Sequence, residues 1–101
     1  MTDAAAALTP GFMVRRAPGV LTKQLDGTML LASGEGKQGH CMDRIGRRIW
    51  DVLAQPRSLA EVCQLLGGEF AVDPAVCLRD TTEFIRELLE KHLVVPHQPG
   101  T

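Results

Sequence analysis

The sequence predicts an α+β domain, similar to a winged helix-turn-helix, in which a three-stranded antiparallel sheet is followed by three helices. Two observations support this fold class. Apolar residues follow a two-residue period in the N-terminal half, and from Asp43 onward they recur with the 3.6-residue period of a helix. All strand patterns precede the helix patterns, which favours helices packed on one face of an antiparallel sheet. The 101 residues are enough for one domain.

The predicted sheet begins with a hairpin. Residues 20–25 and 28–32 have the alternating pattern of paired strands. Asp26-Gly27 between them suits a type I′ turn, in which both central residues need a positive φ. Residues 33–39 contain three glycines and predict a loose connection. Residues 40–42 then add a short third strand.

Each predicted helix begins at a capping residue, namely Asp43, Ser58 or Asp73. Glu61 completes a capping box with Ser58, and Pro74 takes the first position of the third helix. Pro56 is expected to end the first helix, and Gly67-Gly68 the second. The predicted inner faces carry Ile45, Ile49, Trp50, Val52 and Leu53 in the first helix, Leu59, Val62, Cys63, Leu65 and Leu66 in the second, and Val76, Cys77, Thr81, Phe84, Ile85, Leu88 and Leu89 in the third.

The ends of the chain show no periodicity. We expect residues 1–11 to form a disordered arm, residues 12–95 the folded domain, and residues 96–101 a flexible tail. Within the domain, residues 12–14 are expected to dock as an apolar latch, and residues 93–95 to close the fold.

Composition excludes several classes of protein. Eleven Lys and Arg against twelve Asp and Glu give a net charge of −1, so the chain lacks the excess of positive charge expected of a nucleic-acid binder. No apolar run approaches a membrane span, and the first residues lack a signal-peptide pattern, so we expect a cytoplasmic protein. The three cysteines form no C-x-x-C pair, which argues against a disulfide scaffold or a zinc site. We expect no metal, no cofactor and no enzymatic activity, since one small core leaves little room for a catalytic pocket.

A winged-helix DNA-binding regulator is the alternative that the fold class invites. The predicted second helix, however, has no Lys or Arg, and the third sets Arg79, Arg86 and Lys91 against four acidic residues. Because affinity for DNA depends on cations that release counterions, this charge pattern disfavours the alternative.

The first helix carries a basic cluster formed by Arg44, Arg47 and Arg48 at i, i+3 and i+4. This cluster is either a solvated face or a binding site for acidic groups of a partner enzyme. Arg57 would extend such a binding site. In the second case the protein would be an adaptor that binds enzymes through these arginines. His40 and Cys41 lack companions at metal-ligand spacing and an orienting group for a nucleophile.

The third predicted strand has no later strand to pair with its outer side. Such an open edge exposes backbone N–H and C=O groups, and residues 40–42 contain neither the proline nor the charge that usually blunts an edge. An extended peptide can add to an open edge through main-chain hydrogen bonds. A second copy of the chain could pair there too, so the protein is expected to be a monomer or an edge-paired dimer.

From residue 19 to residue 95 the sequence resembles the PqqD-like family, the leader-binding domains (RiPP recognition elements) of ribosomally made, post-translationally modified peptides. The resemblance rests on the order and spacing of several short sequence motifs: Leu30-Leu31, the run from Met42 to Leu53 with Gly46, Ile49 and Trp50, Pro56-x-Ser58-x-x-Glu61-x-x-x-x-Leu66, Phe70-x-Val72-Asp73, and Asp80-x-x-x-Phe84-Ile85-x-x-Leu88. The sequence departs from the family at His92, where many members have glycine, and in the loop before the third strand, which lacks an aromatic residue.

The resemblance implies a non-catalytic protein that binds the leader of a precursor peptide as an added strand, between the third strand and the third helix. The implied edge residues are Gln38, Gly39, His40, Cys41 and Met42. The implied opposite wall is formed by Asp80, Glu83, Phe84 and Glu87, with Arg79 as a further contact. Phe84 could instead belong to the core, and Asp80 could be an ordinary solvated acid.

The implied partners are the precursor leader and the modifying enzyme, or the leader peptidase and cyclase, of the pathway. The discrete domain and the first helix with Trp50 are similar to leader-binding proteins of lasso-peptide pathways. The same domain also serves radical-enzyme pathways, including the one that makes pyrroloquinoline quinone, which is the alternative.

Overall fold

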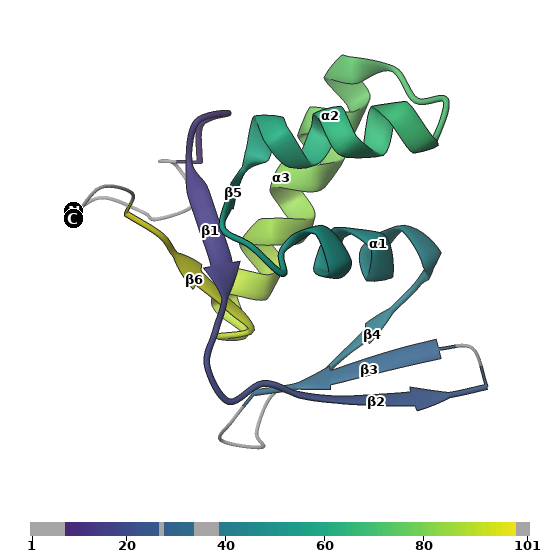
Figure 1. Cartoon of the computed structure of the whole chain (residues 1–101), viewed down its shortest axis with the longest axis vertical. Coiled ribbons are helices and arrows are strands. Elements are labelled where there is room, and N and C mark those ends of the chain that lie inside the picture. The colour runs from purple at the N-terminus through teal and green to yellow at the C-terminus, as the bar shows by residue number, and fades with distance from the viewer. Residues whose placement is uncertain (1–7, 27, 34–38, 99–101) are drawn as a thin grey trace.

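Two small sheets and three helices form the part of the chain that the computed structural model describes, residues 8–26, 28–33 and 39–98 (Figure 1). In chain order the elements are β1 (Met13–Arg16), β2 (Leu21–Leu25), β3 (Thr28–Ala32), β4 (Gly39–Met42), α1 (Arg44–Val52), β5 (Arg57–Ser58), α2 (Leu59–Glu69), α3 (Pro74–Glu90) and β6 (Val94–Pro96). The predicted fold class is confirmed, because an antiparallel three-stranded sheet precedes three helices.

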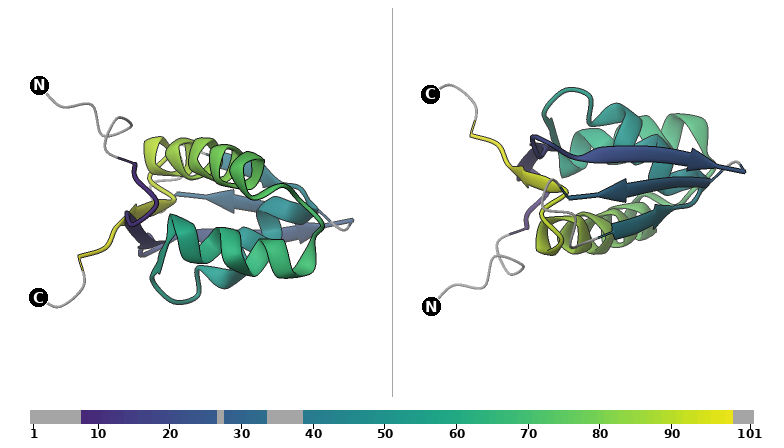
Figure 2. Two further views of the ribbon diagram at one scale, coloured as in Figure 1. Left: turned by 90° about the horizontal axis from the view of Figure 1, so that it is seen from above. Right: turned by 90° about the horizontal axis from the view of Figure 1, so that it is seen from below.

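The first sheet has the order β2-β3-β4, with antiparallel pairing throughout. Leu25 lies opposite Thr28, so two residues connect β2 and β3. Asp26 has a φ of 48°, which agrees with the predicted type I′ turn at this position; Gly27 lies outside the described residues. The right-hand view of Figure 2 shows the three strands side by side with the helices behind them.

The second sheet, with the order β5-β1-β6, was not predicted. Met13 and Val14 of the expected latch belong to its central strand, β1. Val14 lies opposite both Arg57 and Pro96, and its side chain is fully buried. The sequence pattern missed this sheet because β5 has two residues and β6 three, too few to show a period of two.

The ends of the predicted domain take part in this sheet. The N–H of Ala60 donates to the carbonyl of Pro10 at 2.9 Å, so the described end of the predicted arm is held in place. The predicted tail begins inside β6, and the N–H of His97 donates to the carbonyl of Met13 at 2.9 Å. The sequence-based boundaries at residues 11 and 96 therefore lie inside the folded part of the chain.

All three predicted caps are present. Asp43 Oδ1 accepts from the N–H of Gly46 at 2.7 Å, Ser58 and Glu61 form a complete capping box, and Asp73 Oδ1 accepts from Ala75 and Val76. Two predicted ends were wrong. α1 ends at Val52, before Pro56, and α2 continues to Glu69 through the exposed Gly67 and Gly68, since the N–H of Phe70 still reaches the carbonyl of Leu66 at 2.7 Å.

The core lies between the helices and the inner faces of both sheets. Trp50 is buried, and the Arg16 guanidinium lies 4.6 Å above its ring while donating to its carbonyl at 2.6 Å. This contact ties β1 to α1. Two residues placed on the predicted inner faces are not in the core: Ile45 is 44% exposed and Val76 41% exposed. Both belong to the groove described below.

α3 ends in a Schellman motif with His92 in the left-handed region, at a φ of 60°. The N–H of Leu93 donates to the carbonyl of Leu88 at 2.9 Å, and that of His92 to Leu89 at 3.1 Å. The helix therefore ends as it would with glycine, but with a side chain that disfavours this conformation.

We expect His92→Gly to raise the free energy of unfolding by up to about 1 kcal/mol, because relief of left-handed strain exceeds the entropy that glycine adds to the unfolded chain. The His92 side chain is exposed, so no packing is lost. Chemical denaturation measures the difference. A lower stability for the glycine variant would contradict this account of the helix end.

Candidate functional site

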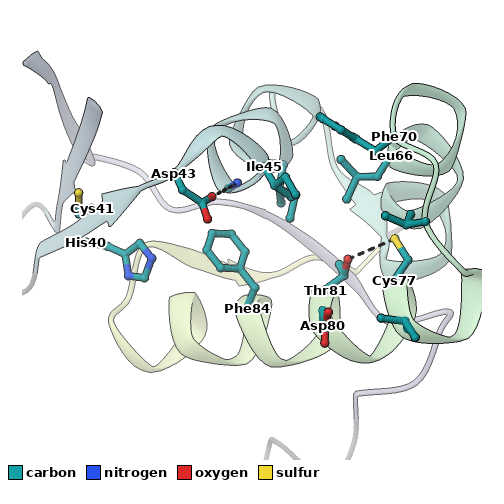
Figure 3. A pocket seen from close by; sticks show the side chains of 14 residues that line it. His40, Cys41, Asp43, Ile45, Leu66, Phe70, Cys77, Asp80, Thr81 and Phe84 are labelled. Carbon is teal, nitrogen blue, oxygen red and sulfur yellow. Dashed lines mark hydrogen bonds between the residues drawn. The ribbon is translucent and has the colours of Figure 1, made fainter. Parts of the chain in front are cut away.

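A cavity of about 380 Å³ opens between β4, α1 and α3, and the end of α2 lies at its far side (Figure 3). We call this cavity and the adjoining outer edge of β4 the groove. Its lining residues are His40, Cys41, Asp43, Ile45, Gly46, Ile49, Leu66, Phe70, Val72, Val76, Cys77, Asp80, Thr81 and Phe84.

The groove is apolar and open to solvent. Ile45, Val72 and Val76 all line it, and each exposes between 40% and 44% of its surface. They are three of the four large hydrophobic residues that the described part of the chain exposes; the fourth is Leu21, on β2. Apolar side chains gathered at an open cavity are typical of a binding site. The exposure of these three side chains at the groove was not predicted from the sequence.

Gly46 lets the first turn of α1 approach α3 closely. A β-carbon at Gly46 would lie 3.0 Å from Cζ of Phe84, 3.1 Å from Asp43 Oδ1 and 3.1 Å from the Met42 sulfur. Met42 is 2% exposed and forms part of the core below the groove. Phe84 therefore contacts both the core and the cavity. It combines the groove role and the core role between which the sequence did not decide.

β4 is an edge strand, and the hairpin register fixes which of its backbone groups point outward. The two-residue connection makes Leu25 and Thr28 a hydrogen-bonded pair, so Leu30 and Ala32 also bond to β2. The alternate residues, Met29 and Leu31, bond to Met42 and His40. The N–H and C=O groups of Gly39 and Cys41 consequently point away from β3, toward the groove.

Three charged or titratable side chains gather where β4 meets the end of α3. Lys91 Nζ donates to the carbonyl of Gly39 at 3.3 Å and to His40 Nδ1 at 3.1 Å, and lies 3.4 Å from Glu87 Oε2. The His40 ring packs edge-on against Phe84, with centroids 5.5 Å apart. Burial lowers the pKa of His40, and the charge of Lys91 lowers it further. His40 is neutral at pH 7, so its 3.7 Å approach to Glu87 is not an ion pair at that pH.

The lowered pKa of His40 makes stability depend on pH. Unfolded chains take up a proton near the ordinary histidine pKa of 6.5, whereas folded His40 does so only at lower pH. The unfolded state then binds more protons, and we expect the free energy of unfolding to fall as pH decreases from 7.5 to 5.5. Denaturation of wild type and His40→Gln at several pH values tests this. The wild-type slope should be steeper; equal slopes would contradict the assignment.

The structure brings some predicted site residues together and separates others. His40, Cys41, Asp80 and Phe84 line the cavity, Gly39 lies at the β4 edge, and Glu87 lies at the Lys91 end. Arg79 and Glu83 are exposed on α3 outside the cavity lining, and Met42 is buried. Gln38 lies outside the described residues.

Two of the three arginines in the predicted basic cluster, Arg44 and Arg48, have partners within the chain. Arg48 forms a bidentate pair with Glu69, with a shortest distance of 2.6 Å, and Arg44 lies 5.5 Å from the Phe70 ring centroid. Arg57 donates to the carbonyl of Val52 at 3.1 Å. The contacts of Arg44 and Arg48 hold the start of α1 and the end of α2 together, next to the groove.

Within the described residues, His, Cys, Asp and Glu side chains form no group of three or more that could hold a metal ion. None of the described helices has the length and apolar character needed to cross a bilayer.

Comparison with known families identifies the chain. Residues 28–94 match the family described as coenzyme PQQ synthesis protein D (PqqD), a span that runs from β3 to β6 and includes the whole groove. The chain belongs to the PqqD family. A search of curated proteins found no significant match.

Solved structures share the fold of this chain. TbiB1 in complex with the TbiA(beta) leader peptide matches with a TM-score of 0.72 and 24% identity, over 83% of this chain and 98% of TbiB1. Lasso peptide synthetase B1 complexed with the leader peptide matches with a TM-score of 0.63 and 25% identity, over 82% of this chain and 98% of that one. The PqqD truncation of Methylobacterium extorquens PqqCD, a stand-alone RiPP recognition element, has a TM-score of 0.74 and 17% identity, over 92% and 99%.

The resemblance to PqqD-like proteins that the sequence indicated is confirmed. At His92, where the sequence departs from the family, this chain keeps the left-handed helix end without a glycine. The other departure, in the loop before β4, lies outside the described residues.

Proposed function

We propose that this PqqD-family protein is a non-catalytic leader-recognition protein for a ribosomally made, post-translationally modified peptide. The observation that carries the proposal is the open edge of β4, where Cys41 directs its backbone N–H and C=O groups into an apolar groove. Leader peptides are present in the solved complexes of TbiB1 and lasso peptide synthetase B1, two proteins similar to this chain.

The groove suits an extended peptide with apolar and basic side chains. The peptide would pair with β4 through its main chain and place an apolar side chain among Ile45, Val72 and Val76. On α3, Asp80 lines the cavity, and Glu83 and Glu87 are exposed beyond it. These carboxylates favour a leader whose basic residues face α3.

The bound leader would be presented to a modifying enzyme, or to a leader peptidase and cyclase. A lasso peptide is the class that we propose first, because one similar protein is a lasso peptide synthetase B1. A pathway for pyrroloquinoline quinone, or for another product of a radical enzyme, is the second, since the family takes its description from PqqD.

Proline substitutions test whether main-chain pairing at β4 holds the leader. Cys41→Pro removes an outward N–H that β3 does not use, and edge strands tolerate such a proline. By the same alternation, Thr22 on β2 directs its N–H outward from the opposite edge, so Thr22→Pro is the matched control. Binding of the synthetic leader half of a candidate precursor peptide is measured by calorimetry.

We expect Cys41→Pro to weaken leader binding at least tenfold and Thr22→Pro to leave it unchanged, with both variants folded by circular dichroism. Equal affinities for the two folded variants would contradict pairing at β4. Failure of the wild-type chain to bind any candidate leader would contradict the proposed function itself.

A further inference from the structure

Three backbone carbonyls follow one another along the outer side of β4 and the residue after it, at every second position. The Gly39 carbonyl is contacted by Lys91 Nζ at 3.3 Å. The Asp43 carbonyl accepts from the N–H of Arg47 at 2.8 Å, as part of the first turn of α1. The Cys41 carbonyl lies between them, and within the described residues no side chain or helix N–H bonds to it. Cys41 is thus the one position of the three with a free acceptor.

Lys91 is held at its place rather than free in solvent. Its side chain is 27% exposed and is shared between Gly39, His40 and Glu87, at 3.3, 3.1 and 3.4 Å. His40 is held in turn by Phe84, whose ring lines the groove. An anchored ammonium competes better for a carbonyl than a mobile one, because its side-chain entropy is already lost.

We propose that Lys91 confines the complete main-chain pair between the bound leader and β4 to Cys41, by occupying the Gly39 carbonyl. The inference rests on the proposed function. Leader residues on either side of the one opposite Cys41 then point toward the helices and the groove.

Without such a limit the pairing could extend along β4 in steps of two residues, because every second residue directs its N–H and C=O groups outward. Asp43 ends the pairing toward α1 through its helix hydrogen bond, and Lys91 ends it at Gly39. The two contacts together leave Cys41 as the β4 residue that can form a complete pair.

Amide hydrogen exchange, measured by NMR on the ¹⁵N-labelled chain with the synthetic leader, tests this inference. In the wild-type complex we expect the Cys41 amide to gain protection and the Gly39 amide to keep its exchange rate. In Lys91→Met both amides should gain protection, and binding should tighten about two- to tenfold from the added pair. Lys91→Arg keeps the cation and its donors and should behave as wild type.

Lys23→Met is the matched control, because it removes the same charge from the exposed face of β2. It should leave the exchange of both amides unchanged. Protection of Gly39 in the wild-type complex would overturn the inference while leaving leader recognition intact. The same would follow if Lys23→Met reproduced the effect of Lys91→Met. Absence of any protection at β4 with a bound leader would overturn the proposed function and the inference together.

Discussion

Val76→Glu is expected to weaken leader binding about ten- to hundredfold without destabilising the protein. Val76 is 41% exposed and lines the apolar end of the groove, so a carboxylate there would be desolvated by a bound apolar side chain. Stability should be preserved because residue 76 is at the N3 position of α3, where glutamate is favoured by the helix dipole and can reach back to the N-cap at Asp73. Calorimetry and chemical denaturation measure the two effects separately.

Leu21→Glu provides the matched control. Leu21 is also an exposed large hydrophobic residue, at 65%, but it lies on β2 and does not line the groove. We expect the leader affinity of this variant to remain that of wild type. If both glutamates weakened binding equally, a general charge effect would explain the result and the groove assignment would be wrong.

Trp50→Ala is expected to have the largest effect on stability, a loss of about 3–5 kcal/mol in the free energy of unfolding. Trp50 is 4% exposed, and its ring supports the Arg16 guanidinium that joins β1 to α1. Because small domains are stable by about 5–15 kcal/mol, such a loss leaves a marginal protein. Thermal denaturation measures the change.

Trp50 belongs to the sequence motif of residues 42–53 that resembles the PqqD-like family, but in the structure its role is packing. Trp50→Phe, which retains most of the apolar volume, should lose less stability than Trp50→Ala and should still bind the leader. A Trp50→Phe variant that folds with wild-type stability but no longer binds would show that the indole acts at the site instead.

The parts of the fold that depend on local chemistry could be predicted from the sequence. The caps at Asp43, Ser58 and Asp73 and the turn at Asp26 each need only a few neighbouring residues, and all four are present. The second sheet could not be predicted, since β1 is joined to residues more than 40 positions away and shows no pattern of its own.

The candidate site, like the fold, could be predicted from the sequence only in part. The open edge at β4 follows from the order of the strands, so it could be anticipated. Helical periodicity places Ile45 and Val76 on the apolar faces of their helices. It does not show which parts of those faces other elements cover, and these two side chains remain at the surface. The contact of Lys91 with Gly39 joins residues 52 positions apart and has no local sequence signal.

An amide NMR titration of the wild-type chain with the leader half of a precursor peptide tests whether the leader binds between β4 and α3. We expect saturable shifts centred on residues 39–43 and on the groove side of α3, at Asp80, Phe84 and Glu87, with small shifts on β2. Saturable binding whose shifts lie on the second sheet or on β2, with β4 and α3 unchanged, would contradict leader binding in the groove.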